Sequence, residues 1–309
     1  MSKQEITRKG IFFRGVLMGV ADLIPGVSGG TIALITGIYS TLLKSISNID
    51  KIFLGHLLKL EFEKAACHIN LKFLIPLLIG ICSAVLSFAR IMHYLLEYYP
   101  IPLWSLFMGL VGASALVLFR SLEKIKSSET YGAIISGFIF AFTIVGLIPL
   151  QTPDESWFIF VCGFISIMAM ILPGISGSFL LLMLGKYAYI TGALRNPFGE
   201  GALIIIGTFG AGAILGLLSF SRGLNWAMIN YHNRTMAFLT GVLLGSMRKI
   251  WPYKEILEKT LIRGKVKVLR EENIFPPHFD SIFFLGLVLA AIGFVFVTEL
   301  ERRSQFDQD

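Results

Sequence analysis

The sequence predicts an all-α polytopic membrane protein built as an inverted repeat, and three observations predict it. The first is an apolar composition, with 55% hydrophobic and 15% charged residues, against about 25% charged residues in an ordinary soluble domain. The second is a series of apolar segments long enough to span a bilayer. The third is a repeat, because the motif Pro-Gly-x-Ser-Gly occurs at 25–29 and again at 173–177.

The first ten residues, MSKQEITRKG, are polar and basic, and no small-residue cleavage site follows them. We therefore expect no removable signal peptide. The net charge of +7 comes mostly from Lys and Arg between apolar segments, which favours membrane topology over nucleic-acid binding. The three cysteines show no metal-ligand spacing, so no metal site is expected.

The apolar segments fall into two kinds. Two regions, 11–43 and 156–192, are each interrupted near the middle by PGVSGG and PGISGS. Their arms are too short for ordinary spans, which predicts two broken-helix, re-entrant hairpins. About six full transmembrane helices are expected beside them, at 73–95, 103–120, 131–150, 201–222, 234–250 and 281–299.

The loop charges predict the orientation of the chain. The connection 44–72 carries five lysines and follows a basic N-terminus, which places that side in the cytoplasm. Counting spans onward puts the loop 251–280 outside, although it contains six Lys and Arg residues. That loop disagrees with the positive-inside rule, so the sequence leaves its side open.

The two halves match at constant offsets. Six positions of the first hairpin recur at an offset of 148, and seven positions of the next two segments recur at an offset of 132. Gene duplication explains an ordered series that includes Pro, Ser, Arg and Tyr. We treat 1–309 as a single membrane domain, with repeat 1 at 11–125, repeat 2 at 156–250 and an additional C-terminal helix at 281–299.

Three spans separate the hairpins, so the second hairpin is expected to enter from the opposite face of the membrane. Inverted repeats with broken helices recur in secondary transporters, which hold substrate near the bilayer midplane at the repeat interface. The sequence therefore predicts a transporter-like fold. The alternative is a membrane scaffold that transports nothing.

The helix breaks are the candidate binding elements. Proline ends a helix and glycine permits unusual backbone angles, and freed N–H groups at this depth must be buried in protein or line a wet cavity. Such groups suit an anion. The alternative is a pair of kinks that pack helices. The helix-break residues are Pro25, Gly26, Pro173 and Gly174, and the candidate substrate-binding residues are Ser28, Gly29, Gly30, Thr31, Ser176, Gly177 and Ser178.

Three charged residues within apolar segments are candidates for a role in transport. Arg90 and Arg222 end the matching stretches SFAR and SFSR, and a guanidinium binds phosphate through two hydrogen bonds. The alternative is snorkelling to lipid phosphates at the two interfaces. Asp22 precedes the first break, and its repeat counterpart is Met170. It could couple transport to protons, pair with an arginine or cap the bent backbone.

The segment GVLMGVADLIPGVSGGTIALITGIYSTLL, at 15–43, closely resembles the polyprenyl-phosphate transporter family (PopT). PGISGSFLLLMLGKY, at 173–187, resembles the second signature of that family, and the resemblance extends over nearly the whole chain. It implies a multi-pass protein of the bacterial plasma membrane that returns undecaprenyl phosphate, the carrier lipid of cell-wall synthesis, to the inner leaflet.

The resemblance implies a protein that is not an enzyme and has no cofactor, although proton or sodium coupling is compatible with it. Undecaprenyl phosphate and membrane lipids are the expected partners, and a homo-oligomer stays open. Two alternatives remain, a membrane undecaprenyl-pyrophosphate phosphatase and a carrier of a small soluble anion. No nucleophile and base are paired near the breaks, which disfavours the phosphatase.

Overall fold

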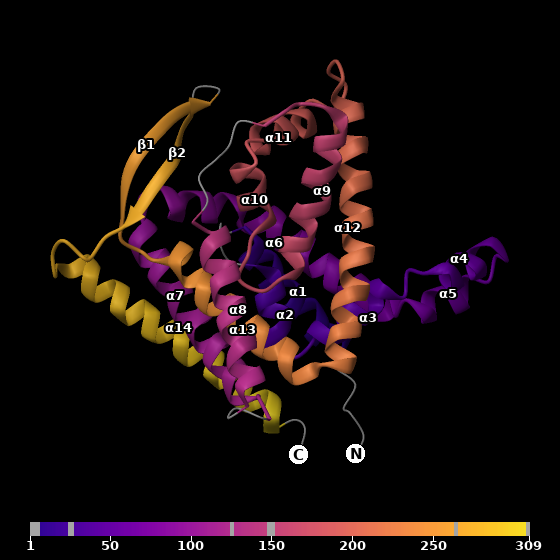
Figure 1. Cartoon of the computed structure of the whole chain (residues 1–309), viewed down its shortest axis with the longest axis horizontal. Helices are drawn as coiled ribbons and strands as arrows, with labels where there is room; N and C mark the ends of the chain where they lie inside the picture. Colours follow the sequence, from indigo (N-terminus) through magenta and orange to yellow (C-terminus); the bar gives the residue numbers. More distant parts are fainter. Residues whose placement is uncertain (1–6, 24–27, 124–126, 147–151, 263–264, 307–309) are drawn as a thin grey trace.

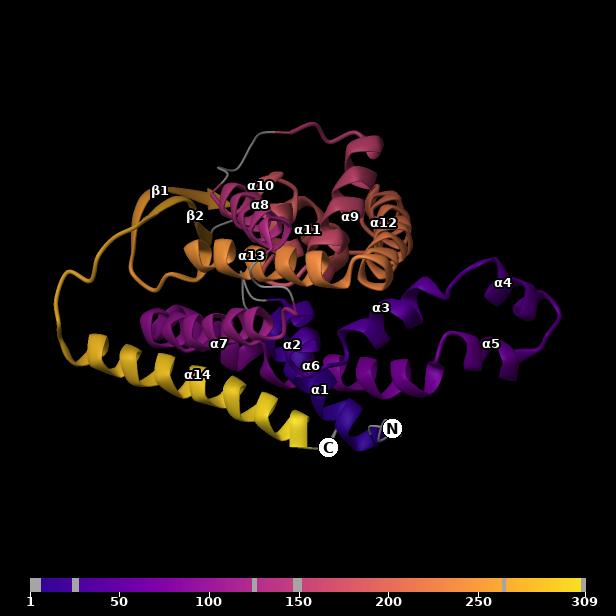
Figure 2. The same ribbon diagram turned by 60° about the horizontal axis from the view of Figure 1, so that its bottom comes forward.

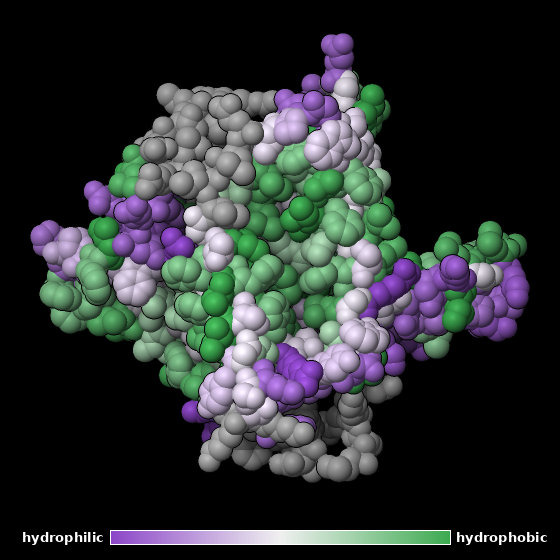
Figure 3. Space-filling view, viewed as in Figure 1, coloured by the Kyte–Doolittle hydropathy of each residue, from purple (hydrophilic) through white to green (hydrophobic). Residues whose placement is uncertain are grey.

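The computed structural model describes residues 7–23, 28–123, 127–146, 152–262 and 265–306. Within these ranges the chain is helical apart from one two-stranded sheet, and the helices form a bundle (Figures 1 and 2). Apolar side chains cover much of the flank in view, while polar ones gather at its ends and on a protruding arm (Figure 3). A multi-pass, mostly α-helical membrane protein is therefore confirmed.

Four described helices are long and apolar enough to cross a membrane: α6 (Leu71–Tyr98), α7 (Pro100–Arg120), α12 (Ala202–Asn230) and α14 (Ser281–Phe306). Two other expected spans differ. Helix α8 (Ser128–Ile144) has 17 residues, and α13 (His232–Ile250) carries polar and basic residues at both ends. The core of α13 is nevertheless buried, since Leu239, Val242 and Leu243 are all 0% exposed.

The two hairpins have the same order of short helices. The first contains α1 (Arg8–Asp22), α2 (Gly29–Ile35) and α3 (Tyr39–Ser47), and the second contains α9 (Ser156–Ile171), α10 (Gly177–Met183) and α11 (Tyr187–Arg195). Each arm after the break was expected to be one short helix. Instead it bends again at Gly37 and Gly185, whose φ angles are +71° and +66°. Only glycine adopts this conformation at little cost, so both arms end one helix and begin another.

Matching helices of the two halves pack on matching partners. Helix α1 lies along α6 as α9 lies along α12, and α14 lies along α7 as α8 lies along α13. A Cβ atom on Gly80 would stand 2.2 Å from the Phe12 carbonyl oxygen, and one on Gly212 would stand 2.0 Å from that of Phe160. These residues correspond at the two sequence offsets. Small residues thus bring the same backbones together in both halves.

Two insertions distinguish the halves. Helices α4 (Lys51–Leu58) and α5 (Phe62–His68) form an arm after α3, and strands β1 (Lys254–Ile262) and β2 (Lys265–Asn273) form an antiparallel hairpin after α13. The arm and the β-hairpin lie at opposite ends of the molecule (Figures 1 and 2). The all-α prediction was wrong for Lys254–Ile262 and Lys265–Asn273, and the alternating stretch KVKV in the second of these favours a strand.

Candidate functional site

The two helix breaks meet inside the bundle. The Ser28 hydroxyl donates to the Met170 carbonyl oxygen at 2.9 Å, and the Gly174 N–H donates to the Thr31 hydroxyl oxygen, also at 2.9 Å. Ser28 and Thr31 are each 1% exposed. Residues 142 and 143 positions apart are therefore joined at one buried junction. Pro25 and Gly26 of the first break lie outside the described residues.

Glycines permit this close approach. A Cβ atom on Gly30 would stand 2.6 Å from the Ile171 carbonyl oxygen, and one on Gly174 would stand 2.6 Å from the Ser246 hydroxyl oxygen. Gly174 also has φ at +81°, directly after the buried Pro173. Side chains at these positions would force the two breaks and α13 apart.

The described polar groups at the start of α2 have partners within the protein. The Asp22 carboxylate accepts a hydrogen bond from the Gly29 N–H at 2.6 Å, and the Ser28 hydroxyl accepts one from the Gly30 N–H at 3.1 Å. Asp22 thus caps the bent backbone, which is one of the three roles considered for it. In this conformation the Ser28 hydroxyl also donates to Met170 and the Thr31 hydroxyl oxygen accepts from Gly174, so both groups already have partners within the protein.

The second break is less closed. The Ser176 and Ser178 hydroxyls bond to each other at 2.8 Å, and Ser178 is exposed. At the position equivalent to Asp22, the Met170 side chain lies close to Gly177, where a Cβ atom would stand 2.7 Å from the methionine Cγ. Helix α10 accordingly begins without a side-chain cap. The two breaks are therefore chemically different in this structure.

The two arginines do not touch the described break residues through hydrogen bonds. Arg90 is exposed on α6. The Arg222 guanidinium donates to the carbonyl oxygens of Ser47 at 3.4 Å and Ile49 at 2.6 Å, at the carboxyl end of α3. That end of a helix carries unsatisfied carbonyl groups and attracts a cation. In this conformation Arg222 holds the first hairpin against α12.

Tyr39 belongs to the junction but was not assigned to it from the sequence. Its hydroxyl donates to the Ile171 carbonyl oxygen at 3.0 Å, and the side chain is 2% exposed. The recurrence of tyrosine at 187, at the same offset as the break motif, was the available signal. It could not reveal that the first tyrosine reaches across to the second break.

Comparison with known proteins agrees with the motifs. The model of the VCA0040-like family, described as undecaprenyl phosphate translocase-like, matches residues 18–268. A Vibrio cholerae protein named "Polyprenyl-phosphate transporter" is 40% identical over 301 residues, which cover 95% of this chain and 96% of that protein.

A Staphylococcus aureus protein of the same name is 31% identical over 253 residues, which cover 77% of this chain and 84% of that protein. No solved structure matches the chain. The family match covers most of the sequence and includes both break motifs. The chain therefore belongs to the VCA0040-like, undecaprenyl phosphate translocase-like family.

Proposed function

We propose that this protein translocates undecaprenyl phosphate across the bacterial plasma membrane and returns the lipid to the cytoplasmic leaflet for cell-wall synthesis. The main support is that two relatives, which match 95% and 77% of this chain, are both named polyprenyl-phosphate transporters. The apolar exterior and the buried junction of two duplicated breaks support the same activity. The proposal assigns the protein no catalytic step.

In the proposed mechanism the two halves are inverted, and each break receives the phosphate from one side of the membrane. Ser28, Gly29, Gly30 and Thr31 bind it on one side, and Ser176, Gly177 and Ser178 bind it on the other, while the prenyl chain stays in lipid. Matched helix contacts in the two halves support the structural repeat on which this proposal is based.

The junction supplies the barrier between the two sides. Hydrogen bonds from Ser28 to Met170 and from Gly174 to Thr31 close the first break. They must open before its hydroxyls can bind a phosphate. A transporter needs two such conformations of comparable free energy. Arg90 and Arg222 are proposed to neutralise the phosphate during the crossing, with Arg222 exchanging its carbonyl partners for the headgroup.

Flipping of labelled undecaprenyl phosphate in proteoliposomes tests the proposal. The purified protein should move the lipid between leaflets, and Arg90→Ala and Arg222→Ala should each slow this movement. Lys59→Ala on the α4–α5 arm, which also removes one exposed cation, is the matched control.

Each outcome bears on a different part. Movement no faster than in empty liposomes would refute the function. Unchanged rates in both arginine variants would remove the arginines from the mechanism and leave transport standing. Phosphate released from undecaprenyl pyrophosphate would instead favour the phosphatase.

A further inference from the structure

A charged cavity of about 710 Å³ lies where α13 ends and the β-hairpin begins. Three cations line it, Arg248 and Lys249 of α13 and Lys254 of β1, and two carboxylates, Glu271 and Glu272, come from β2. The cavity therefore has one net positive charge. Because this charge stands beside apolar helices, it attracts an anion more strongly than a charge in open water would.

Glu271 lies between two of these cations. Its Oε1 atom accepts from the Lys249 and Lys254 ammonium groups, each at 2.6 Å. The lysine side chains are only 17% and 11% exposed, and the glutamate side chain is 26% exposed. One carboxylate oxygen thus occupies a position that an oxygen of a phosphate could take, with both ammonium groups already oriented.

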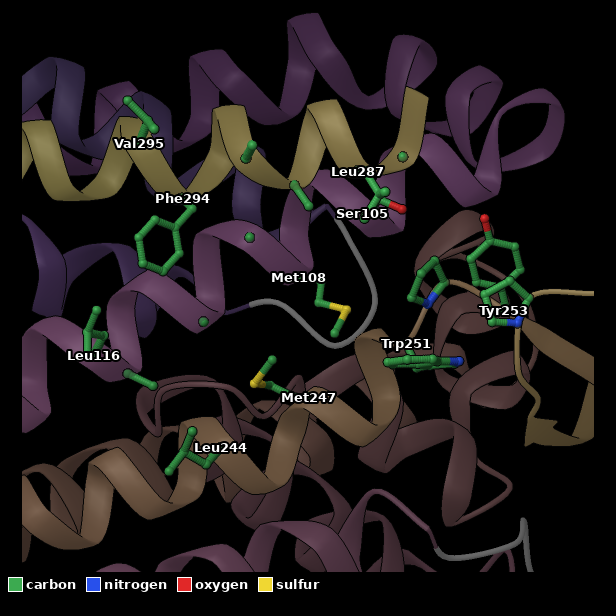
Figure 4. A pocket seen from close by; sticks show the side chains of 18 of the residues that line it. Ser105, Met108, Leu116, Leu244, Met247, Trp251, Tyr253, Leu287, Phe294 and Val295 are labelled. Carbon is green, nitrogen blue, oxygen red and sulfur yellow. The ribbon is translucent and has the colours of Figure 1, made fainter. Parts of the chain in front are cut away.

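An apolar cavity of about 880 Å³ adjoins the charged one. It lies between α7, α13 and α14, and Met108, Leu244 and Met247 project into it, with Trp251 at one end (Figure 4). The same four residues also line the charged cavity, so the two spaces share a wall. A ligand that fits both has an anionic head and an apolar chain.

We propose that this pair of cavities is a loading site for the polyprenyl phosphate, with Lys249 and Lys254 binding the phosphate and the first isoprene units lying in the groove of α7, α13 and α14. This inference rests on the proposed function. The rest of the chain stays in lipid, since the volume of the groove is that of a site for a small molecule.

The charged cavity lies close to the second break. The Lys249 ammonium group lies 4.5 Å from the centroid of the Phe179 ring, and Phe179 and Met183 of α10 line the charged cavity. Phe179 directly follows the exposed Ser178. A phosphate held by the lysines is therefore next to the helix that begins at the less closed break. The site also gives the basic loop 251–280 a role other than orientation.

Binding of farnesyl phosphate, a short prenyl phosphate, tests the phosphate half of the site by isothermal titration calorimetry of the whole protein in micelles. Lys249→Gln and Lys254→Gln should each weaken binding about tenfold, the value of one charge-assisted hydrogen bond. Glu271→Gln should tighten it several-fold, because it removes the negative charge that competes with the phosphate for both ammonium groups. Lys59→Gln, on the distant arm, should leave the affinity unchanged.

The groove has its own matched pair of variants on α14. Leu287 lines the groove and Leu285 does not, although they are 53% and 48% exposed. Leu287→Trp should weaken the binding of farnesyl phosphate about tenfold, and Leu285→Trp should leave it unchanged. The affinity for inorganic phosphate should fall only in the lysine variants, and the affinity for farnesol should fall only in Leu287→Trp. The two probes thus distinguish a site for a lipid headgroup from a site for free phosphate.

Two results overturn the loading site. One is an unchanged affinity for farnesyl phosphate in both lysine variants. The other is weaker binding by a Glu271→Gln variant that unfolds at the wild-type temperature, because the carboxylate would then itself contribute to binding. Flipping assays keep the two proposals distinct. If the wild-type protein flips the lipid and the lysine variants bind and flip it at wild-type levels, the loading site is refuted and the proposed function stands. If the wild-type protein binds farnesyl phosphate at this site but does not flip the lipid, only the proposed function is refuted.

Discussion

Among the three roles considered for Asp22, the structure shows a contact that fits capping of the bent backbone. Its carboxylate accepts the Gly29 N–H at 2.6 Å and thereby caps α2. Asp22→Ala removes this acceptor and should destabilise the protein by about 1 kcal/mol, the usual cost of losing such a cap. Thermal unfolding in detergent measures the loss. Asp22→Asn keeps an acceptor oxygen and should unfold close to wild type.

The same pair of variants tests whether Asp22 couples transport to protons. If its role is capping, Asp22→Asn flips lipid at a wild-type rate and with wild-type pH dependence. Coupling through a titrating carboxylate predicts instead that Asp22→Asn abolishes the dependence of flipping on an imposed proton gradient, because asparagine cannot exchange a proton.

Lys254 gives the charged cavity a pH dependence. Burial and, to a smaller extent, the neighbouring Lys249 lower the pKa of its ammonium group, Glu271 opposes both, and together these effects bring the pKa to about 8. Arg248 and Glu272 face the same cavity. A bound phosphate stabilises the charged form, so farnesyl phosphate should bind most tightly below about pH 8 and weaken as the pH rises through it.

Calorimetry at several pH values measures this change. Lys254→Gln should bind weakly with a flatter profile, and Lys254→Arg should bind well at high pH, because arginine stays charged. An equally steep profile in Lys254→Gln would assign the titration to another group. For stability the sign is opposite: the contribution of Lys254 is complete above its ordinary pKa of 10.5 and is lost as the pH falls through about 8.

Helix pairing depends on glycines against which a backbone carbonyl group of the neighbouring helix packs. Gly212 and Gly210 both lie on α12, but a Cβ atom on Gly212 would stand 2.0 Å from the Phe160 carbonyl oxygen, whereas one on Gly210 would meet nothing within 4 Å. Gly212→Ala should destabilise the protein by about 1–3 kcal/mol through overpacking against α9. Gly210→Ala should be neutral or stabilising, since alanine favours a helix. Unfolding in detergent, followed by helical circular dichroism, compares the two, and equal midpoints would contradict the role of the contact.

At the level of elements, segment length and hydropathy predicted α6, α7, α12 and α14 well, because a bilayer requires long apolar helices. The Pro-Gly motifs predicted both breaks. Neither signal predicted the second bends at Gly37 and Gly185, because a single glycine is common within membrane helices. The β-hairpin was missed because its alternating residues were read only as loop charges.

For the site, the sequence indicated candidate residues but not their hydrogen-bond partners. Ser28 and Thr31 were expected to bind substrate, which stays a prediction, and their bonds to Met170 and Gly174 depend on tertiary packing. The lysine cluster was missed for the same reason. Lys249 and Lys254 are separated from Glu271 by 22 and 17 positions, and only the β-hairpin brings them together.

The arrangement of the whole molecule makes a prediction about sidedness. The α4–α5 arm and the β-hairpin lie at opposite ends (Figures 1 and 2), so a membrane between them puts the basic loop on the side opposite the arm. Cys67 is a native exposed thiol on the arm, and Glu255 is an exposed position on β1. Each can carry the single cysteine of a variant in which the other native cysteines are replaced.

In intact cells a membrane-impermeant maleimide should label Glu255→Cys, and it should label Cys67 only after the inner membrane is opened. This result would place the loading site on the outer face, where the proposed return of the lipid to the cytoplasmic leaflet begins. Labelling of both positions in intact cells would refute the inverted arrangement. Labelling of Cys67 alone would place the lysine cluster on the cytoplasmic face, where it would serve release of the lipid, and the basic loop would then obey the positive-inside rule after all.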